Sequence, residues 1–148
     1  MSREHVISQV CEFFTLPELV CPHTLRKWGK KAWQFLDTDT LHTLLVLRRD
    51  ILRVPLVCNT GTLTQRGFRC NLCDIPKGKT LQGMQYLSAH TMGKAFDLTS
   101  PKMSASDMRK VIMQHADELP CNIRLEDGVN WLHFDTFDTG QKVYVFHI

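Results

Sequence analysis

Two short segments, far apart in the chain, limit the folds that this sequence can adopt. The first runs from Ser88 to Asp97 and places His90 seven positions before Asp97. The second is Trp131-Leu132-His133. Two imidazoles and one carboxylate match the three protein ligands of a catalytic zinc site, whose fourth position is left for water. We therefore expect a fold that brings His133 back to His90 and Asp97.

The length and composition favour one soluble globular domain. The chain has 148 residues, of which 43% are hydrophobic and 22% are charged, and these values are close to the averages for such domains. Its apolar runs are too short to span a bilayer, so we expect no membrane partner. The residues after Met1 lead to no sustained apolar segment, which predicts a protein made in the cytoplasm without a signal peptide. We expect a monomer.

The charge pattern argues against a nucleic-acid partner. The net charge is +3, a weak excess that suits any anionic polymer. The basic residues are scattered, as in Arg26-Lys27, Lys30-Lys31 and Arg48-Arg49, without the dense run or aromatic interleaving of a nucleic-acid surface. We interpret them as solvated faces.

Local patterns predict an α+β fold, in which a small antiparallel sheet carries the zinc and helices pack on its other face. Thr15 and Glu18 have the spacing of a capping box, and Ser104 to Asp107 have the spacing of a helix cap. The expected helices cover residues 16–21, 26–36, 39–51 and 105–118. The expected strands cover residues 54–58, 96–98, 122–126, 129–135 and 142–146, and residues 62–86 are expected to form a long loop.

The dipeptide Asp127-Gly128 between two alternating segments predicts a hairpin with a two-residue turn. In the strand that follows, the period of two places Trp131, His133 and Asp135 on one face and leaves the other face for the core. A polar row of this kind on a strand that also carries core residues indicates a lined cleft.

The pattern Ser-x-His-x-x-Gly-x-Ala-x-Asp, followed by an aromatic residue two positions before a His, resembles the zinc D-Ala-D-Ala carboxypeptidase and L-alanyl-D-glutamate endopeptidase family. The hedgehog signalling domain shares that scaffold. Within the family the chain is most similar to small peptidases of phages and prophages, whose N-terminal segments resemble residues 14–22 and 29–36. The resemblance covers nearly the whole chain.

The resemblance implies that His90, Asp97 and His133 bind Zn²⁺ and that the chain hydrolyses a peptide bond in bacterial peptidoglycan. It also implies an arginine that holds a carboxylate or carbonyl oxygen of the stem peptide, for which the bidentate guanidinium fork is suited. Arg69 stands at that position, and Arg66 is the second choice.

Two further residues, Ser88 and Trp131, are predicted to contact substrate. Trp131 has a second interpretation as a core residue, because a tryptophan beside a ligand strand suits either place.

The general base is the one departure from the family pattern. Many members place an acid three residues before the last His, where this chain has Asn130, and an amide cannot accept the proton of water. Hedgehog-like relatives place the acid before the hairpin turn, where Glu126 lies, so we predict Glu126, with Asp127 and Asp135 as alternatives. A two-residue turn would pair Glu126 with Val129, which makes its reach to the metal doubtful.

The six cysteines are expected to be mostly buried thiols, as is usual for a protein kept in a reducing compartment. Cys70-Asn71-Leu72-Cys73 also has the spacing of half a structural zinc site or of a redox pair. The sequence has no second CxxC motif, so Cys58 or Cys121 would have to complete such a site in space.

Two interpretations of function follow from these residues. In the first, the chain is a zinc peptidase that reaches the cell wall after holin release or as part of a virion. In the second, the scaffold and metal are kept while Asn130 has removed catalysis, and the domain serves as a silent structural or recognition module. Fold and metal alone do not guarantee turnover.

Overall fold

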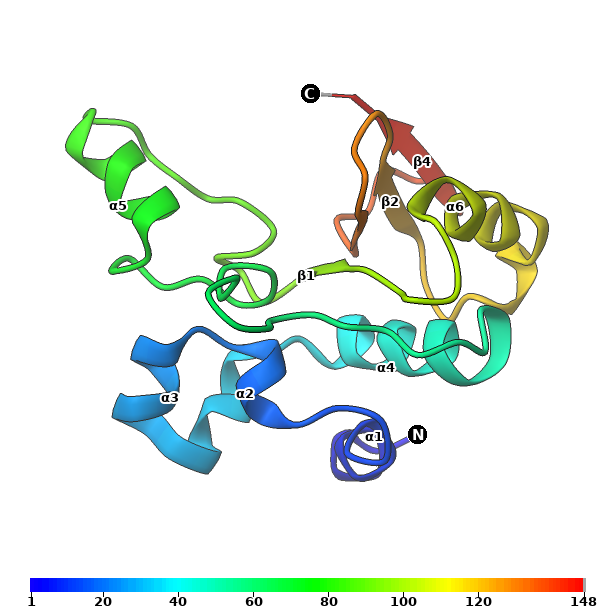
Figure 1. The fold of residues 1–148 in the computed structure, drawn as a ribbon, viewed down its shortest axis with the longest axis horizontal. Helices are drawn as coiled ribbons and strands as arrows, with labels where there is room; N and C mark the ends of the chain where they lie inside the picture. The colour runs from blue at the N-terminus through cyan, green and yellow to red at the C-terminus, as the bar shows by residue number, and fades with distance from the viewer. Residues whose placement is uncertain (148) are drawn as a thin grey trace.

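The computed structural model describes residues 1–147, in which a four-stranded sheet follows a helical N-terminal half (Figure 1). The strands are β1 (Ala95–Leu98), β2 (Ile123–Glu126), β3 (Leu132–Asp135) and β4 (Val143–Phe146), in the spatial order β1-β3-β2-β4. The predicted α+β class is confirmed.

The sheet is mixed, so the prediction of a purely antiparallel sheet is wrong. β1 and β2 pair antiparallel with β3, but β4 runs parallel to β2. β4 runs parallel to β2 because β3 ends beside the start of β2, where Asp135 pairs with Arg124. The chain then passes to the free edge of β2 and begins β4 beside Ile123, so the two strands share a direction.

The connection between β2 and β3 is longer than the predicted two-residue turn. Arg124 pairs with Asp135 and Leu125 pairs with Phe134, and one further step in this register sets Glu126 opposite His133. Residues 127–131 therefore form a wide loop. The Arg109 guanidinium stabilises it by donating hydrogen bonds to the carbonyls of Val129 and Trp131, each at 3.2 Å.

One face of the sheet belongs to the core. Phe96, Phe134 and Leu125 form a fully buried row across β1, β3 and β2. Helices α4 (Thr38–Val46) and α6 (Ala105–Gln114) supply the apolar side chains that pack with this row. The opposite face carries Asp97 and His133, which pair across β1 and β3. The expectation of helices on one face and polar residues on the other is confirmed.

Most predicted helices are present, although several differ in extent. Besides α4 and α6, the structure has α2 (Leu16–Leu19) and α3 (Pro22–Trp28), and it has two helices that were not predicted, α1 (Arg3–Val10) and α5 (Asp74–Leu81). There are also 3-10 turns at Gly29–Phe35 and Ala116–Glu118 and a π-helical extension of α4 at Leu47–Ile51. The Thr15–Glu18 capping box and the Ser104 cap are present as predicted. A single helix over 26–36 is wrong, because Gly29 takes a positive φ of 54° and breaks it.

One predicted strand and one predicted loop also differ from the structure. Residues 54–58 form no strand, since only Val57 makes an isolated bridge, to Thr99. The segment 62–86, predicted as a loop, contains α5, which projects from the body of the molecule (Figure 1). Within residues 1–147, none of the helices has the length and apolar character needed to cross a membrane.

Candidate metal centre

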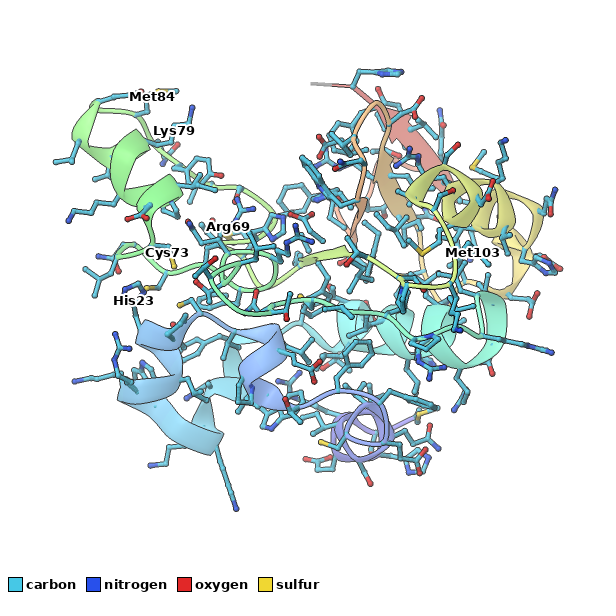
Figure 2. All side chains as sticks on the ribbon, viewed as in Figure 1. His23, Arg69, Cys73, Lys79, Met84 and Met103 are labelled. Carbon is cyan, nitrogen blue, oxygen red and sulfur yellow. The ribbon has the colours of Figure 1, made fainter. Side chains whose placement is uncertain are left out.

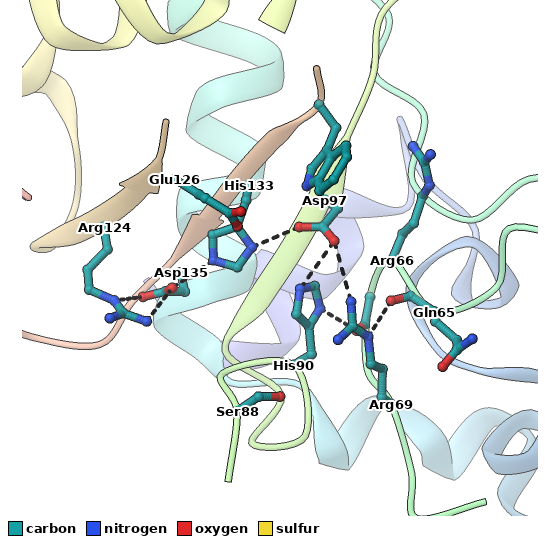
Figure 3. A network of polar contacts seen from close by, with 12 residues as sticks. Gln65, Arg66, Arg69, Ser88, His90, Asp97, Arg124, Glu126, His133 and Asp135 are labelled. Carbon is teal, nitrogen blue, oxygen red and sulfur yellow. Dashed lines mark hydrogen bonds and ion pairs between the residues drawn. The ribbon is translucent and has the colours of Figure 1, made fainter. Parts of the chain in front are cut away.

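His90, Asp97 and His133 converge on one point, as the sequence predicts. Each offers one ligand atom, and these atoms lie within 4.8 Å of one another. His133 Nδ1 lies 2.8 Å from Asp97 Oδ1, and His90 Nε2 lies 3.3 Å from Asp97 Oδ2 (Figure 3). All three residues are buried, with residue exposures of 5%, 8% and 6%.

His90 is aimed by a tight turn and one backbone carbonyl. Gly93 closes the turn with a φ of 71°, and a Cβ at this position would overlap the Phe35 carbonyl oxygen, so only glycine fits. His90 Nδ1 lies 2.9 Å from the carbonyl oxygen of Gly67, which makes Nδ1 the donor. The other nitrogen, Nε2, is then free to bind a metal.

His133 is held on its far side by Asp135. Its Nε2 lies 2.8 Å from Asp135 Oδ2, and Asp135 is fully buried and accepts two hydrogen bonds from the Arg124 guanidinium, at 2.8 and 2.9 Å. A carboxylate behind a histidine fixes the ring and leaves Nδ1 as the ligand atom. The support of His133 by Asp135 was not predicted. The alternating row of residues 131, 133 and 135 is the sequence pattern that could have indicated it.

The charges of the cluster are strongly coupled. Burial acts against the imidazolium, but hydrogen bonds to Asp135 and Asp97 outweigh it and raise the pKa of His133 to about 9. Burial also acts against the Asp97 carboxylate, yet hydrogen bonds from His133 and His90 hold its pKa well below the usual value. The site therefore favours a cation between these side chains, either a proton or a metal ion.

A cavity of about 360 Å³ opens over the three residues. The predicted substrate residues Arg69, Ser88 and Trp131 line it, together with Glu126. Trp131 therefore lies at the cavity wall, and its second interpretation as a core residue does not describe its place.

The two candidate arginines differ in position. Arg69 is nearly buried and its Nη2 lies 3.5 Å from Asp97 Oδ2, while its Nε and Nη1 donate to the Gln65 carbonyl and the Tyr86 hydroxyl. The side chain of Arg66 does not line the cavity and extends away from it in Figure 3. Its backbone carbonyl instead accepts a hydrogen bond from Asp97 N–H at 2.7 Å.

The candidate bases are also separated. Glu126 is 6% exposed and faces the cavity beside His133 (Figure 3). Asp127 contacts Arg109 and lines a different hollow, beside α6. Asp135 is fully occupied by Arg124 and His133. Asn130 is exposed and does not line the cavity, so its identity leaves the groups that face His90, Asp97 and His133 unchanged.

A second group of side chains could hold a metal ion. The ligand atoms of Cys21, His23, Cys70 and Cys73 all lie within 4.8 Å of one another. Cys58 and Cys121, which the sequence offered as partners for Cys70 and Cys73, do not belong to this group. Cys58 is fully buried in the apolar core instead, where burial raises the pKa of its thiol. The spacing Cys21-Pro22-His23 is the sequence signal that could have identified the missing ligands.

No protein-family model, curated protein or solved structure matches this chain. The family resemblance therefore rests on the residues of the two motifs.

Proposed function

We propose that this chain is a zinc-dependent peptidase that hydrolyses a peptide bond in bacterial peptidoglycan. One observation carries the proposal: two histidines and an aspartate share one point at the floor of a cavity that also holds a carboxylate and an arginine. These are the parts that metal-assisted amide hydrolysis requires.

The three ligands fit zinc. Imidazole nitrogen and carboxylate oxygen are both zinc donors, and three protein ligands leave one coordination position open. Gly67 and Asp135 hold the far nitrogens of His90 and His133, so the ligand nitrogens are oriented in advance. A bound zinc ion would supply a water of lowered pKa and polarise the scissile carbonyl.

Glu126 is the group we assign to proton transfer. One step beyond the Leu125–Phe134 pair of β2 and β3 places it opposite His133, and both side chains line the cavity. Opposed side chains in an antiparallel pair have Cβ atoms about 5 Å apart, which is close enough for a carboxylate to reach a water held above the ring. Glu126 would accept a proton from that water and pass it to the leaving amine.

Arg69 is the group we assign to substrate orientation and oxyanion charge. Its guanidinium stands at the cavity wall beside Asp97, where its planar fork can pair with a carboxylate or carbonyl oxygen of the stem peptide. Ser88 and Trp131 line the same cavity and would contact the peptide chain. We propose peptidoglycan as the substrate because of the motif resemblance. The same resemblance leads us to propose that the protein acts on the cell wall after holin release or from a virion.

Incubation of the purified zinc-loaded protein with cell walls of several chemotypes tests the proposal. We expect loss of turbidity and the release of new amino and carboxyl termini, identified by mass spectrometry. The His133→Ala variant should be inactive, while His5→Ala, an exposed histidine outside the cluster, should retain activity. Product masses also tell a carboxypeptidase, which releases a terminal amino acid, from an endopeptidase.

The same experiment decides against the proposal if the wild type, shown by elemental analysis to contain zinc, cleaves none of the wall types or stem peptides. That result would favour the silent structural or recognition module, for which binding to intact walls without cleavage is the expected behaviour.

A further inference from the structure

We propose that Cys21, His23, Cys70 and Cys73 bind a second zinc ion, which is structural and fastens the arginine-bearing loop to the helical half of the chain. The four residues come from two segments that are far apart in sequence, one at the start of α3 and the other just before α5. Figure 2 shows His23 and Cys73 side by side where these segments meet.

The distances suit a tetrahedral ion. All four ligand atoms lie within 4.8 Å of one another, and Cys73 Sγ lies 3.7 Å from His23 Nδ1. With Zn–S near 2.3 Å and Zn–N near 2.0 Å, neighbouring sulfur and nitrogen ligands of a tetrahedral zinc are about 3.6 Å apart. The side chains thus stand at the spacing of zinc ligands.

The backbone builds this arrangement independently of the side chains. Val20 and Phe68 form a parallel bridge, and Cys21 N–H donates to the Phe68 carbonyl at 3.1 Å. Gly67 permits the approach, because a Cβ there would overlap the Leu19 carbonyl oxygen. These contacts bring Cys21 beside the turn that begins at Cys70.

The turn itself presents both of its sulfurs. Cys73 N–H donates to the Cys70 carbonyl at 3.2 Å, and Leu72 N–H points to Cys70 Sγ at 3.4 Å. Cysteine sulfur binds metal as the thiolate, so this short turn offers two ligand atoms. The Cys-x-x-Cys turn is therefore shaped as one half of a metal site.

The ligand set indicates a structural ion. Three cysteines and one histidine fill all four positions of a tetrahedral zinc, so no position is left for water or substrate. Cys21 and Cys73 are almost completely buried, with exposures of 0% and 2%. A disulfide would engage only two of the three sulfurs and would leave His23 without a role, and all the cysteines are free.

The segment of residues 71–87 buries few large apolar side chains. Leu72, Leu81 and Leu87 are exposed by 58%, 79% and 62%, so apolar burial contributes little to holding it. A structural zinc supplies binding energy that becomes folding energy. In this chain it would restrain the segment that holds Arg69, which is adjacent to Cys70, and Gly67, whose carbonyl accepts the hydrogen bond from His90.

Cobalt substitution tests the second site without using activity. Metal-free full-length protein, kept reduced, is titrated with Co²⁺ alone, and thiolate-to-cobalt charge-transfer absorption is recorded. Only the cysteine site has sulfur ligands, so we expect this band in the wild type and in His133→Ala. It should weaken or disappear in Cys70→Ser, which removes one of the three thiolates, and be kept in full in Cys11→Ser, since Cys11 is exposed and outside the cluster. Zinc content should fall by one equivalent per chain in Cys70→Ser.

A variant that is expected to increase the signal distinguishes loss of the metal site from a failure to fold. His23→Cys adds a fourth thiolate, so its charge-transfer band should be stronger than that of the wild type, whereas His23→Ala should weaken metal retention. The proposal is overturned if the wild type shows no thiolate band, if Cys70→Ser keeps the full band, or if a disulfide joins two of these cysteines in protein purified under reducing conditions.

Discussion

Asp97 and His133 face each other across the β1–β3 pair, with the Asp97 carboxylate 2.8 Å from His133 Nδ1. The next strand continues the row, because one step beyond the Leu125–Phe134 pair of β2 and β3 places Glu126 opposite His133. Three strands therefore align the Asp97 carboxylate, the His133 imidazole and the Glu126 carboxylate on one face of the sheet. The rigidity of the sheet would keep these groups in fixed relation during a reaction.

Glu126→Gln is expected to abolish proton transfer and keep the metal. The loss of a general base lowers kcat by about 10²- to 10⁴-fold, while zinc content should stay at the wild-type value because Glu126 is not among the three ligands. Asp127→Asn is the matched control, since Asp127 contacts Arg109 and lines another hollow. Equal losses in the two variants would contradict the assignment.

Asp135→Asn is expected to weaken metal binding without removing a ligand. The carboxylate holds His133 Nε2 at 2.8 Å, and the loss of such a supporting group lowers metal affinity by about 10- to 100-fold. Competition with a zinc chelator measures this change. Raising the zinc concentration should restore most of the activity, and an affinity equal to that of the wild type would show that Asp135 does not orient the ring.

Arg69→Ala is expected to lower kcat/KM by about 10- to 100-fold, the range for loss of a hydrogen bond to a charged group. Arg69→Lys keeps the charge without the planar fork and should recover only part of the loss. Arg66→Ala should have a far smaller effect, because the Arg66 side chain does not line the cavity. A larger loss in the Arg66 variant would exchange the two assignments.

The metal-free protein is expected to lose stability in mild alkali. The folded pKa of His133 is raised from 6.5 to about 9, so its stabilising charge is fully present below pH 6.5 and is lost as the pH rises through about 9. Urea unfolding with a chelator present, from pH 6 to 10, measures this loss. The loss should be smaller in His133→Asn, and identical pH profiles for the two proteins would rule out this linkage.

Local sequence patterns predicted the three residues of the candidate metal centre and much of the secondary structure. Capping residues such as Thr15 and Ser104 marked the starts of helices, because caps act through hydrogen bonds within a few residues of themselves. The period of two along residues 131–135 predicted which side chains face the cavity. The patterns missed the break at Gly29 and the helix α5, where local periodicity is weak.

Register could not be predicted in the same way. The Asp-Gly pair suggested a two-residue turn that would have paired Glu126 with Val129, but Arg109, a residue of α6, holds open the wider loop over 127–131. The hydrogen bonds from Arg109 join residues about 20 positions apart, and the sequence of the strand contains no pattern that predicts them. Because the connection spans residues 127–131, Glu126 lies beside His133 and not opposite Val129.

The sequence by itself determined the chemistry available to this protein: two histidines and an aspartate at motif spacing, an arginine ahead of them, and cysteines in a Cys-x-x-Cys turn. Tertiary structure alone decided which of these groups meet. It separated Arg69 from Arg66 and Glu126 from Asp127, and it joined Cys21 and His23 to Cys70 and Cys73. The physical reason is that residue type sets what a side chain can bind, whereas long-range strand pairing and packing set its distance from its partners.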